Sequence, residues 1–447
     1  MNISDSERIS SFLEKEGFAL ASEMELSDLV IFNTCGIRQT AENRAYSIIN
    51  NLRKKRGSGV RIILTGCLAN RPDVQKRMRS KVDFFCSIKD FPEKVSSIKK
   101  KLNTRYEIRD TKNNFQKEAI NYLSINPKHI NQHQAYVPIM TGCNNFCSYC
   151  VVPYARGREV SRPTKEIISE IKSLIQAGYK QITLLGQNVN SYSYKVYKVR
   201  KVEKMIGFAE LLEMIDKIPG KFWIQFVSSH PKDMTPELIE TVTKLKKVCE
   251  WIHLPLQAGD DEILARMNRK YTSKHYLNLI KQIKANFKKN KPTLPFSISS
   301  DIIVGFPGET RAQFANSAEI MRKANFDMVF FGQFSPRPNT AAWTMKDNVS
   351  QQEKARREKF LNEILKKTAF ENNQKYIGTI QEMLIEKLET KAPTEDLSSK
   401  QKSFVYFGKT RTQKNVRISS PKKLTIGAFI KAKITKANIW NLEAEIK

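Results

Sequence analysis

The feature that most constrains the fold of this chain is a regular alternation of short apolar runs with amphipathic helical patterns, from the start to about residue 331. In the first region, Leu29–Phe32 and Arg61–Leu64 have the apolar character of buried strands, whereas Ser4–Lys15 and Ala41–Lys54 carry apolar residues at helical spacing. Strands that alternate with helices in this way are typical of a parallel sheet covered by helices. We therefore predict an α/β domain over residues 1–123, followed by polar linker segments around residues 112–117 and 126–134.

The second region repeats the strand–helix unit more regularly, and we predict a domain over residues 134–370. One helix, Lys165–Ala177, ends before a glycine, and another, Thr235–Leu245, begins with Thr-Pro. Six strands joined by helical crossovers favour a partly closed (β/α)6 barrel over an open sheet, and such barrels carry their chemistry at the carboxyl ends of the strands. The expected strands are Tyr136–Met140, Gln181–Leu185, Phe222–Val227, Trp251–Leu254, Phe296–Val304 and Met328–Phe331.

The third region follows a helix rich in Lys and Arg, Gln351–Phe370, and changes to short strands separated by turn signals. This pattern predicts a small all-β barrel of OB-like size over residues 374–447. Its expected strands are Ile380–Ile385, Phe404–Phe407, Asn415–Ile418, Phe429–Ile434 and Asn438–Ala444.

The charge of the chain indicates a polyanionic partner. Lys and Arg number 76 against 45 Asp and Glu, which leaves a net charge of +31. Leu397–Leu442 contains eleven Lys or Arg and no Asp or Glu, interleaved with Phe404, Tyr406, Phe407 and Phe429. A charge run is often only a solvated face, but a run of one sign with aromatic residues on a predicted barrel favours contact with nucleic acid.

Membrane insertion and secretion are not expected. No stretch approaches the roughly 20 apolar residues that a spanning helix needs. Met1–Met24 contains several acidic residues, which are atypical of a targeting segment. We therefore expect a cytoplasmic protein, in which seven cysteines indicate metal ligation or catalysis rather than a disulfide framework.

Three of those cysteines, Cys143, Cys147 and Cys150, lie within eight residues just after the first predicted barrel strand. Three thiolates at this spacing can each bind a different iron of a cubane cluster and leave the fourth iron free for a small molecule. The alternative is a zinc site completed by a residue elsewhere, such as His129 or His133.

This loop resembles that of the radical S-adenosylmethionine (SAM) enzymes, and the resemblance extends along nearly the whole chain. The segments that flank it are similar to the methylthiotransferases, and four further segments are similar to the MiaB branch of that family. The first set is Gly142–Gly157 and Ser161–Pro163, and the second is Leu185–Asn190, Ser229–Pro231, His253–Gln257 and Ser300–Thr310.

The resemblance implies three parts that match the regions above: an N-terminal domain with an auxiliary [4Fe–4S] cluster, a radical SAM barrel, and a C-terminal TRAM barrel that binds tRNA. It also implies insertion of a methylthio group at C2 of N6-isopentenyladenosine 37 in tRNA. SAM would serve both as methyl donor and as radical source. The expected partners are tRNA and a reductant protein such as flavodoxin or ferredoxin, and the expected state is a monomer.

The resemblance assigns roles to particular residues. Two of the assigned positions, Gln257 and Asp301, are equally compatible with ordinary structural hydrogen bonds. His230 and His253 lie in motifs at strand ends, but neither has an evident carboxylate partner in the sequence. The expected ligands of the radical SAM cluster are Cys143, Cys147 and Cys150, and the expected contacts to SAM or substrate are Gly186, Gln187, Gln257 and Asp301.

The auxiliary cluster is where the chain departs from the family pattern. The family uses three cysteines, of which Cys35 and Cys67 are present, each just after a predicted strand. The first family cysteine lies in a Gly-Cys-Gln-Met-Asn segment, whereas this chain begins with Met-Asn. Either a start codon has been assigned too far downstream or the chain is truncated. Cys86, after another strand-like run, is an unexpected candidate ligand but is more typical of a buried apolar residue, and Cys249 is expected in the core.

Two alternative functions stay open from the sequence. The reaction could be the same with a different substrate, either threonylcarbamoyladenosine in tRNA or an aspartate of a ribosomal protein. The chain could instead be an RNA-binding iron–sulfur protein that is inactive in sulfur insertion because it lacks the first cysteine.

Overall fold

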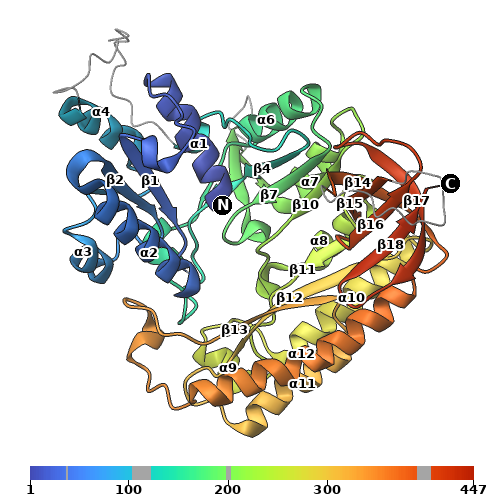
Figure 1. Ribbon diagram of the computed structural model, residues 1–447. Coiled ribbons are helices and arrows are strands. Elements are labelled where there is room, and N and C mark those ends of the chain that lie inside the picture. Colours follow the sequence, from blue (N-terminus) through green and yellow to red (C-terminus); the bar gives the residue numbers. More distant parts are fainter. Residues whose placement is uncertain (37–38, 103–121, 198–202, 390–403, 447) are drawn as a thin grey trace, which may run out of the picture. The chain divides into compact units, whose positions relative to one another are not determined.

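The computed structural model describes residues 1–36, 39–102, 122–197, 203–389 and 404–446 (Figure 1). It divides into two compact units. The first comprises residues 1–130, 138–162 and 335–344, and the second comprises residues 131–137, 163–334 and 345–447. The predicted linker at residues 112–117 lies outside the described residues.

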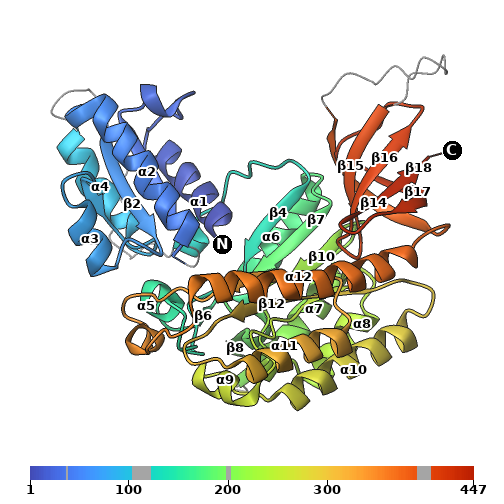
Figure 2. The same cartoon turned by 60° about the horizontal axis from the view of Figure 1, so that its bottom comes forward.

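The first unit is built on a parallel sheet in the order β1-β2-β3, as the alternating pattern predicted. Because side chains alternate along a strand, Ile62 and Leu64 of β2 pack against α2 and α3, whereas Ile63 packs in a second cluster with α1 and α4. Helices therefore cover both faces of the sheet (Figure 2). The elements are α1 (Asn2–Lys15), β1 (Leu29–Thr34), α2 (Gln39–Arg56), β2 (Arg61–Gly66), α3 (Pro72–Met78), β3 (Phe84–Phe85) and α4 (Phe91–Leu102).

Two segments from later in the chain complete this unit. One is the loop with the three clustered cysteines, framed by β5 (Met140–Thr141), α5 (Val152–Arg156) and β6 (Val160–Ser161). The other is residues 335–344, whose Ala342 N donates to Ser148 O at 2.7 Å within the cysteine loop. In the same segment Arg337 Nη1 lies 3.2 Å from Glu42 Oε2 on α2.

The second unit contains six parallel strands in two sets of three, β10-β7-β4 and β11-β12-β13. A bridge between Ile224 of β10 and Val248, ahead of β11, links the two sets, so the partly closed barrel predicted from the sequence is confirmed. The strands are β4 (Gln134–Pro138), β7 (Gln181–Leu185), β10 (Trp223–Phe226), β11 (Trp251–His253), β12 (Ser297–Val304) and β13 (Met328–Gln333). The helices are α6 (Thr164–Gln176), α7 (Phe208–Asp216), α8 (Pro236–Lys244), α9 (Asp261–Arg266), α10 (Ser273–Asn290), α11 (Arg311–Ala324) and α12 (Gln351–Gln374).

Local chemistry explains the helix boundaries. Thr235 caps α8 by accepting a hydrogen bond from Leu238 N at 3.2 Å, as its Thr-Pro start predicted. Gly178, just past α6, takes φ of 93°, a conformation that glycine adopts at little cost. One feature was not predicted: the hairpin β8 (Ser193–Tyr197) and β9 (Glu203–Gly207), which interrupts the alternation between β7 and α7.

The C-terminal region forms a closed five-stranded barrel in the order β14-β15-β16-β18-β17, which confirms the small all-β domain. Its strands are β14 (Ile380–Leu388), β15 (Phe404–Thr410), β16 (Asn415–Ser420), β17 (Phe429–Ala437) and β18 (Asn441–Glu445). The barrel contacts the parallel strands where they begin. The Trp223 and Phe429 ring centroids are 4.7 Å apart, and Ser297 Oγ donates to Thr412 O at 2.6 Å.

Candidate iron–sulfur site and cofactor site

The loop from Cys143 to Cys150 is held in a tight conformation by its own backbone. Cys143 N donates to Gly157 O at 3.1 Å, and Cys150 N donates to Cys147 O at 2.9 Å. Gly142, which leads into the loop, has φ of 79°, and a Cβ there would lie 2.0 Å from Arg158 O. Only glycine therefore allows the two ends of the loop to approach this closely.

Cys143 is buried, whereas Cys147 and Cys150 of this loop are half-buried. Burial is the largest effect and raises the pKa of Cys143; burial, with Cys147 beside it, raises the pKa of Cys150 to about 12. A thiol with a raised pKa is a poor nucleophile, whereas a metal removes the proton of a thiol that coordinates it. The loop therefore suits metal ligation better than covalent catalysis.

The geometry favours a cluster over the alternative zinc site. No three Cys, His, Asp or Glu side chains converge on a single-ion position among the residues that the structure describes. A cubane does not need such convergence, because each thiolate binds a different iron. The two histidines proposed as a fourth zinc ligand have other neighbours. His129 Nδ1 lies 3.0 Å from Glu7 Oε2, and the His133 side chain packs against Gly427.

Cys35 and Cys67 follow β1 and β2 at the same edge of the first sheet. The register pairs Thr34 with Gly66, and Cys67 N donates to Thr34 O at 2.9 Å, so the two cysteines follow paired positions. The start of α1 lies beside them. Burial is the largest effect on the Met1 amino group and lowers its pKa, while Cys67 and Cys35 are close enough to act in the opposite direction.

The remaining cysteines are core residues. Cys86 is 2% exposed in the cluster that joins β2, α1 and α4, and burial raises its pKa to about 11. Cys249 packs with Trp223 and Leu384 below the C-terminal barrel, as expected.

The two groups of cysteines come together within the first unit. An ideal Cβ on Gly36 would lie 3.1 Å from Cys67 Cβ and 3.3 Å from Val151 Cγ2. Because Gly36 follows Cys35 and Val151 follows Cys150, these contacts bring the β1–β2 edge against the three-cysteine loop. This proximity was not predicted, since the sequence placed the two groups in separate domains.

Gly186 and Gln187 follow β7 at its carboxyl end, as predicted. Gly186 is buried. Both polar atoms of the Gln187 side chain are buried without a hydrogen-bond partner among the described residues. Leaving a buried amide unpaired is costly, so this side chain is suited to a polar group that the protein itself does not provide.

The structure brings Gln257 and Asp301 together through the backbone. Gln257 N donates to Asp301 O at 2.8 Å, and Ile303 N donates to Gln257 O at 2.9 Å. Gln257 takes φ of 70°, a strained conformation for a residue other than glycine. These bonds continue the pairing of β11 with β12 and leave both side chains to other partners.

The expectation that the strand-end histidines lack a carboxylate partner was wrong for His253. Its Nε2 lies 3.4 Å from Asp301 Oδ2, and its Nδ1 lies 2.9 Å from Ser299 Oγ. Forty-eight positions separate His253 and Asp301 in the sequence, but the parallel pairing of β11 and β12 places them side by side.

Polar side chains on the buried strands β7 and β10 were also missed. Gln225 Nε2 donates to Thr183 Oγ1 at 2.7 Å, while Gln225 Oε1 and Ser229 Oγ are buried without a partner among the described residues. Like Gln187, they are buried polar groups that follow or lie on the parallel strands.

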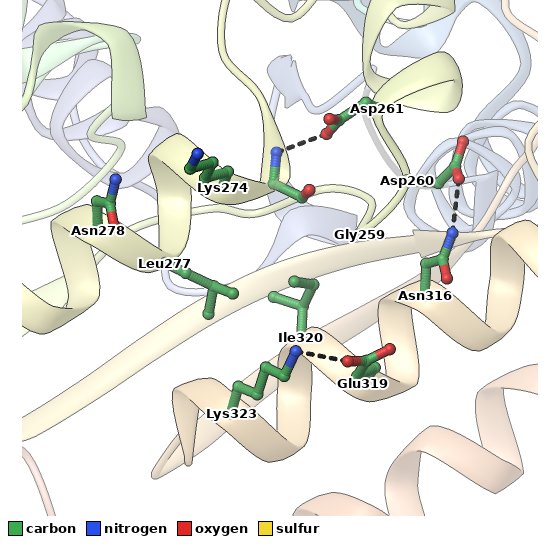
Figure 3. Close-up of a pocket in the computed structure, with 11 residues that line it drawn as sticks. Gly259, Asp260, Asp261, Lys274, Leu277, Asn278, Asn316, Glu319, Ile320 and Lys323 are labelled. Atoms are coloured by element: carbon green, nitrogen blue, oxygen red, sulfur yellow. Dashed lines mark hydrogen bonds and ion pairs between the residues drawn. The ribbon is translucent and has the colours of Figure 1, made fainter.

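A pocket of about 490 Å³ lies elsewhere, between the starts of α9 and α10 and the middle of α11 (Figure 3). Several of its polar groups are paired with one another: Asp260 Oδ2 accepts from Asn316 Nδ2 at 2.8 Å, and Lys323 lies 2.5 Å from Glu319. It contains none of the predicted site residues.

The aromatic residues of the basic barrel are less available than the sequence suggested. Tyr406 is 1% exposed in the barrel core, and Phe429 packs on Trp223. Two of the basic residues are also engaged, because Arg411 bonds Glu250 and Lys414 bonds Asp327. The exposed basic residues are Lys422, Lys423, Lys431, Lys433 and Lys436.

Comparison with known proteins agrees with this architecture. The radical SAM superfamily profile matches residues 137–321, and the profile of the uncharacterized protein family UPF0004 matches residues 1–87. The radical S-adenosylmethionine methyltransferase TsrM from Kitasatospora setae superposes with a TM-score of 0.51 at 12% identity, over 78% of this chain and 74% of that one. No helix in the described part of the chain is long and apolar enough to cross a membrane.

The three-cysteine loop, the partial barrel and the superfamily match define the class of this protein: it is a radical SAM protein, a class that uses a [4Fe–4S] cluster and SAM. The tRNA-2-methylthio-N(6)-dimethylallyladenosine synthase of Clostridium botulinum (strain Hall) is 38% identical over 100% of this chain and 94% of the relative. The synthase of the same name from Carboxydothermus hydrogenoformans is 38% identical over 99% and 96%. The chain belongs to the family of these synthases.

Proposed function

We propose that this protein inserts a methylthio group at C2 of N6-isopentenyladenosine 37 in tRNA, with SAM as both methyl donor and radical source. The observation that carries the proposal is identity of 38% along the whole chain to synthases named for this product. An aromatic C–H bond is inert to ordinary acid–base catalysis, so the reaction needs cofactor chemistry, and the protein supplies binding and orientation.

Cys143, Cys147 and Cys150 would hold the radical SAM cluster, which together with SAM supplies the one-electron chemistry that removes the C2 hydrogen. The donor set fits, since all three thiols lie on one short loop and are buried or half-buried. Among the residues proposed to contact SAM or substrate, Gln187 has the clearest support, because its buried amide has no partner among the described residues. Gly186, Gln257 and Asp301 complete that proposed set, and His253 would orient Asp301.

Cys35 and Cys67 would hold the second [4Fe–4S] cluster, which supplies the site for sulfur. Support comes from their paired positions at one sheet edge and from their proximity to the radical SAM loop through Gly36. The start of α1 lies next to both thiols.

tRNA would bind the C-terminal barrel through its exposed lysines. Lys431 and Lys433 alternate with buried residues on β17, so they share its outer face. A reductant protein such as flavodoxin or ferredoxin would deliver electrons, and the protein would work as a cytoplasmic monomer. The corresponding domains are residues 1–123, 134–370 and 374–447.

The test is an anaerobic assay of the reconstituted protein with SAM, reductant and tRNA that carries N6-isopentenyladenosine. Nucleosides and small molecules are then measured by mass spectrometry. We expect the methylthio-adenosine product together with 5′-deoxyadenosine. A Cys35→Ala variant should still form 5′-deoxyadenosine but no methylthio product, and Cys86→Ala is the matched control because Cys86 is a core thiol of the same domain. Absence of product from the parent protein, with 5′-deoxyadenosine still formed, would contradict the proposed reaction.

A further inference from the structure

Arg156 lies at the end of the short helix that follows the three-cysteine loop. α5 begins two residues after Cys150 and ends at Arg156, and the next carbonyl, that of Gly157, accepts the hydrogen bond from Cys143 N. The arginine is only 4% exposed. Its position is therefore tied at both ends to the residues proposed to hold the radical SAM cluster.

The two terminal nitrogens of this guanidinium differ in their partners among the described residues. Nη2 donates to Asp5 Oδ2 at 2.6 Å and to Asn2 Oδ1 at 3.2 Å, both on α1. Nη1 of Arg156 and Oδ1 of Asp5 are buried without a hydrogen-bond partner in the described part of the chain. A buried charged group with an unmet donor is destabilising, so such a group calls for an explanation.

The guanidinium lies by the sheet edge that carries Cys35 and Cys67, because Asn2, to which Arg156 donates, also accepts from Asn33 Nδ2 at 2.8 Å near the end of β1. Burial alone would lower the pKa of Arg156, but the Asp5 carboxylate and then the Cys67 sulfur more than offset burial and raise it. Gly36 also lies close to both Cys67 and Val151. Val151 directly precedes α5, the helix that ends at Arg156. The guanidinium therefore lies where the two groups of cysteines meet.

We propose that Nη1 of Arg156 donates a hydrogen bond to anionic sulfur at the Cys35–Cys67 site, with Asp5 holding the guanidinium in position. The inference rests on the proposed function, because it requires the second cluster at these two cysteines. A charge-assisted hydrogen bond is stronger than a neutral one, and hydrogen bonds to the sulfurs of a cluster set its reduction potential. Arg156 is then a positioning residue that stabilises the more negative, reduced form of the second cluster.

The experiment isolates that cluster in the full-length chain. With Cys143, Cys147 and Cys150 all changed to Ala, iron and sulfide reconstituted under anaerobic conditions can occupy only the proposed second site. The midpoint potential is then measured by redox titration with EPR detection. We expect Arg156→Gln to shift the reduction equilibrium at least tenfold toward the oxidised form, which is about 59 mV lower for a one-electron couple.

Arg156→Lys keeps a cation for Asp5 but lacks the second arm of the fork, so it should fold and still lower the potential. The matched control is Arg53→Gln. Arg53 Nη2 pairs with Asp83 Oδ2 at 2.7 Å in the same domain, so this variant also removes an arginine–aspartate pair. Asp83 lies just before β3, away from the proposed cysteine ligands. An unchanged potential in both Arg156 variants at normal iron content would overturn the inference and leave the second cluster intact. Failure of the triple-Ala parent to bind any cluster would instead refute the second cluster, and the inference with it.

Discussion

Two buried groups of charged residues in this protein differ in how completely their bonds are satisfied. In the second unit, the Glu250 carboxylate accepts hydrogen bonds from Arg411 Nε at 2.7 Å, Arg411 Nη2 at 2.9 Å and Lys291 Nζ at 2.7 Å. None of the buried polar atoms of these three side chains lacks a partner among the described residues. In the first unit, Arg156 and Asp5 are more deeply buried, with 4% and 0% of their side chains exposed against 18% for Arg411, and each keeps one unmet atom.

This difference distinguishes a group that only stabilises the fold from a group that is suited to bind a ligand. The Glu250 group joins the C-terminal barrel to the start of β11, and its bonds are complete within the protein. The Arg156 group lies by two sets of cysteines, and its bonds are incomplete among the described residues. Native proteins rarely leave buried polar groups unpaired without a functional reason.

The largest effect should come from the cysteine loop. Cys147→Ala removes one of three ligands of the radical SAM cluster, so SAM cleavage and methylthio product should both fall to background. The measurement is 5′-deoxyadenosine formation under anaerobic conditions. Cys249→Ala is the matched control, since that cysteine is buried in the barrel contact and should leave cleavage per folded molecule unchanged. Persistent 5′-deoxyadenosine in Cys147→Ala would refute the assignment.

The second prediction concerns the complete group. Glu250→Gln leaves Arg411 and Lys291 buried without a carboxylate, so the free energy of unfolding should fall by about 3–5 kcal/mol. Denaturant unfolding measures the change. Glu240→Gln is the control: Glu240 pairs with Lys244 on an exposed helix face, and its replacement should have no measurable effect. A small loss in Glu250→Gln would mean that the barrel contact does not depend on this group.

In both regions the sequence predicts the secondary-structure elements but not the charged pairs, for a physical reason. The strands, helices and closed barrel were predicted because apolar periodicity and turn residues are local signals. The Arg156–Asp5 bond joins residues 151 positions apart, and Glu250–Arg411 joins residues 161 apart. Neither pairing leaves a periodic trace in one sequence.

For the candidate site, the sequence named the proposed cysteine ligands but not the contacts around them. Cys143, Cys147 and Cys150 were identifiable because all three lie in one short segment. The His253–Asp301 pair was missed, although it follows from the register of two neighbouring strands that were themselves predicted. The convergence of the cysteine groups at Gly36 depends on packing between segments over a hundred residues apart, which a single sequence does not specify.

The third prediction concerns His230, a buried histidine of the second unit. Burial first, and then Arg269 and Lys232, lower the pKa of His230 to about 2. An unfolded histidine titrates near 6.5, so below that pH the unfolded chain binds a proton that the folded chain does not. Stability from this residue is complete above pH 6.5 and should be lost at about 1.4 kcal/mol per pH unit as the pH falls below it.

His230→Asn should flatten this dependence between pH 6.5 and 4.5, because asparagine does not titrate and can still cap η5 (Pro231–Asp233). Urea unfolding at a series of pH values measures the slope. His275→Gln is the control, as His275 is exposed. An equally steep slope in His230→Asn would show that other groups cause the acid sensitivity.

The smallest effect should come from the outer face of the same barrel that Glu250 anchors. Lys431 and Lys433 are exposed on β17, and replacing both with Gln should weaken tRNA binding and make its logarithmic dependence on salt shallower by about one unit per lysine. Binding is measured at several salt concentrations. The control is Lys323→Gln, which removes a lysine that is paired with Glu319 on α11. If the two lysines contact phosphates, only the β17 variant changes the slope. An equal effect in both variants would mean that net charge, rather than a defined barrel face, attracts the RNA.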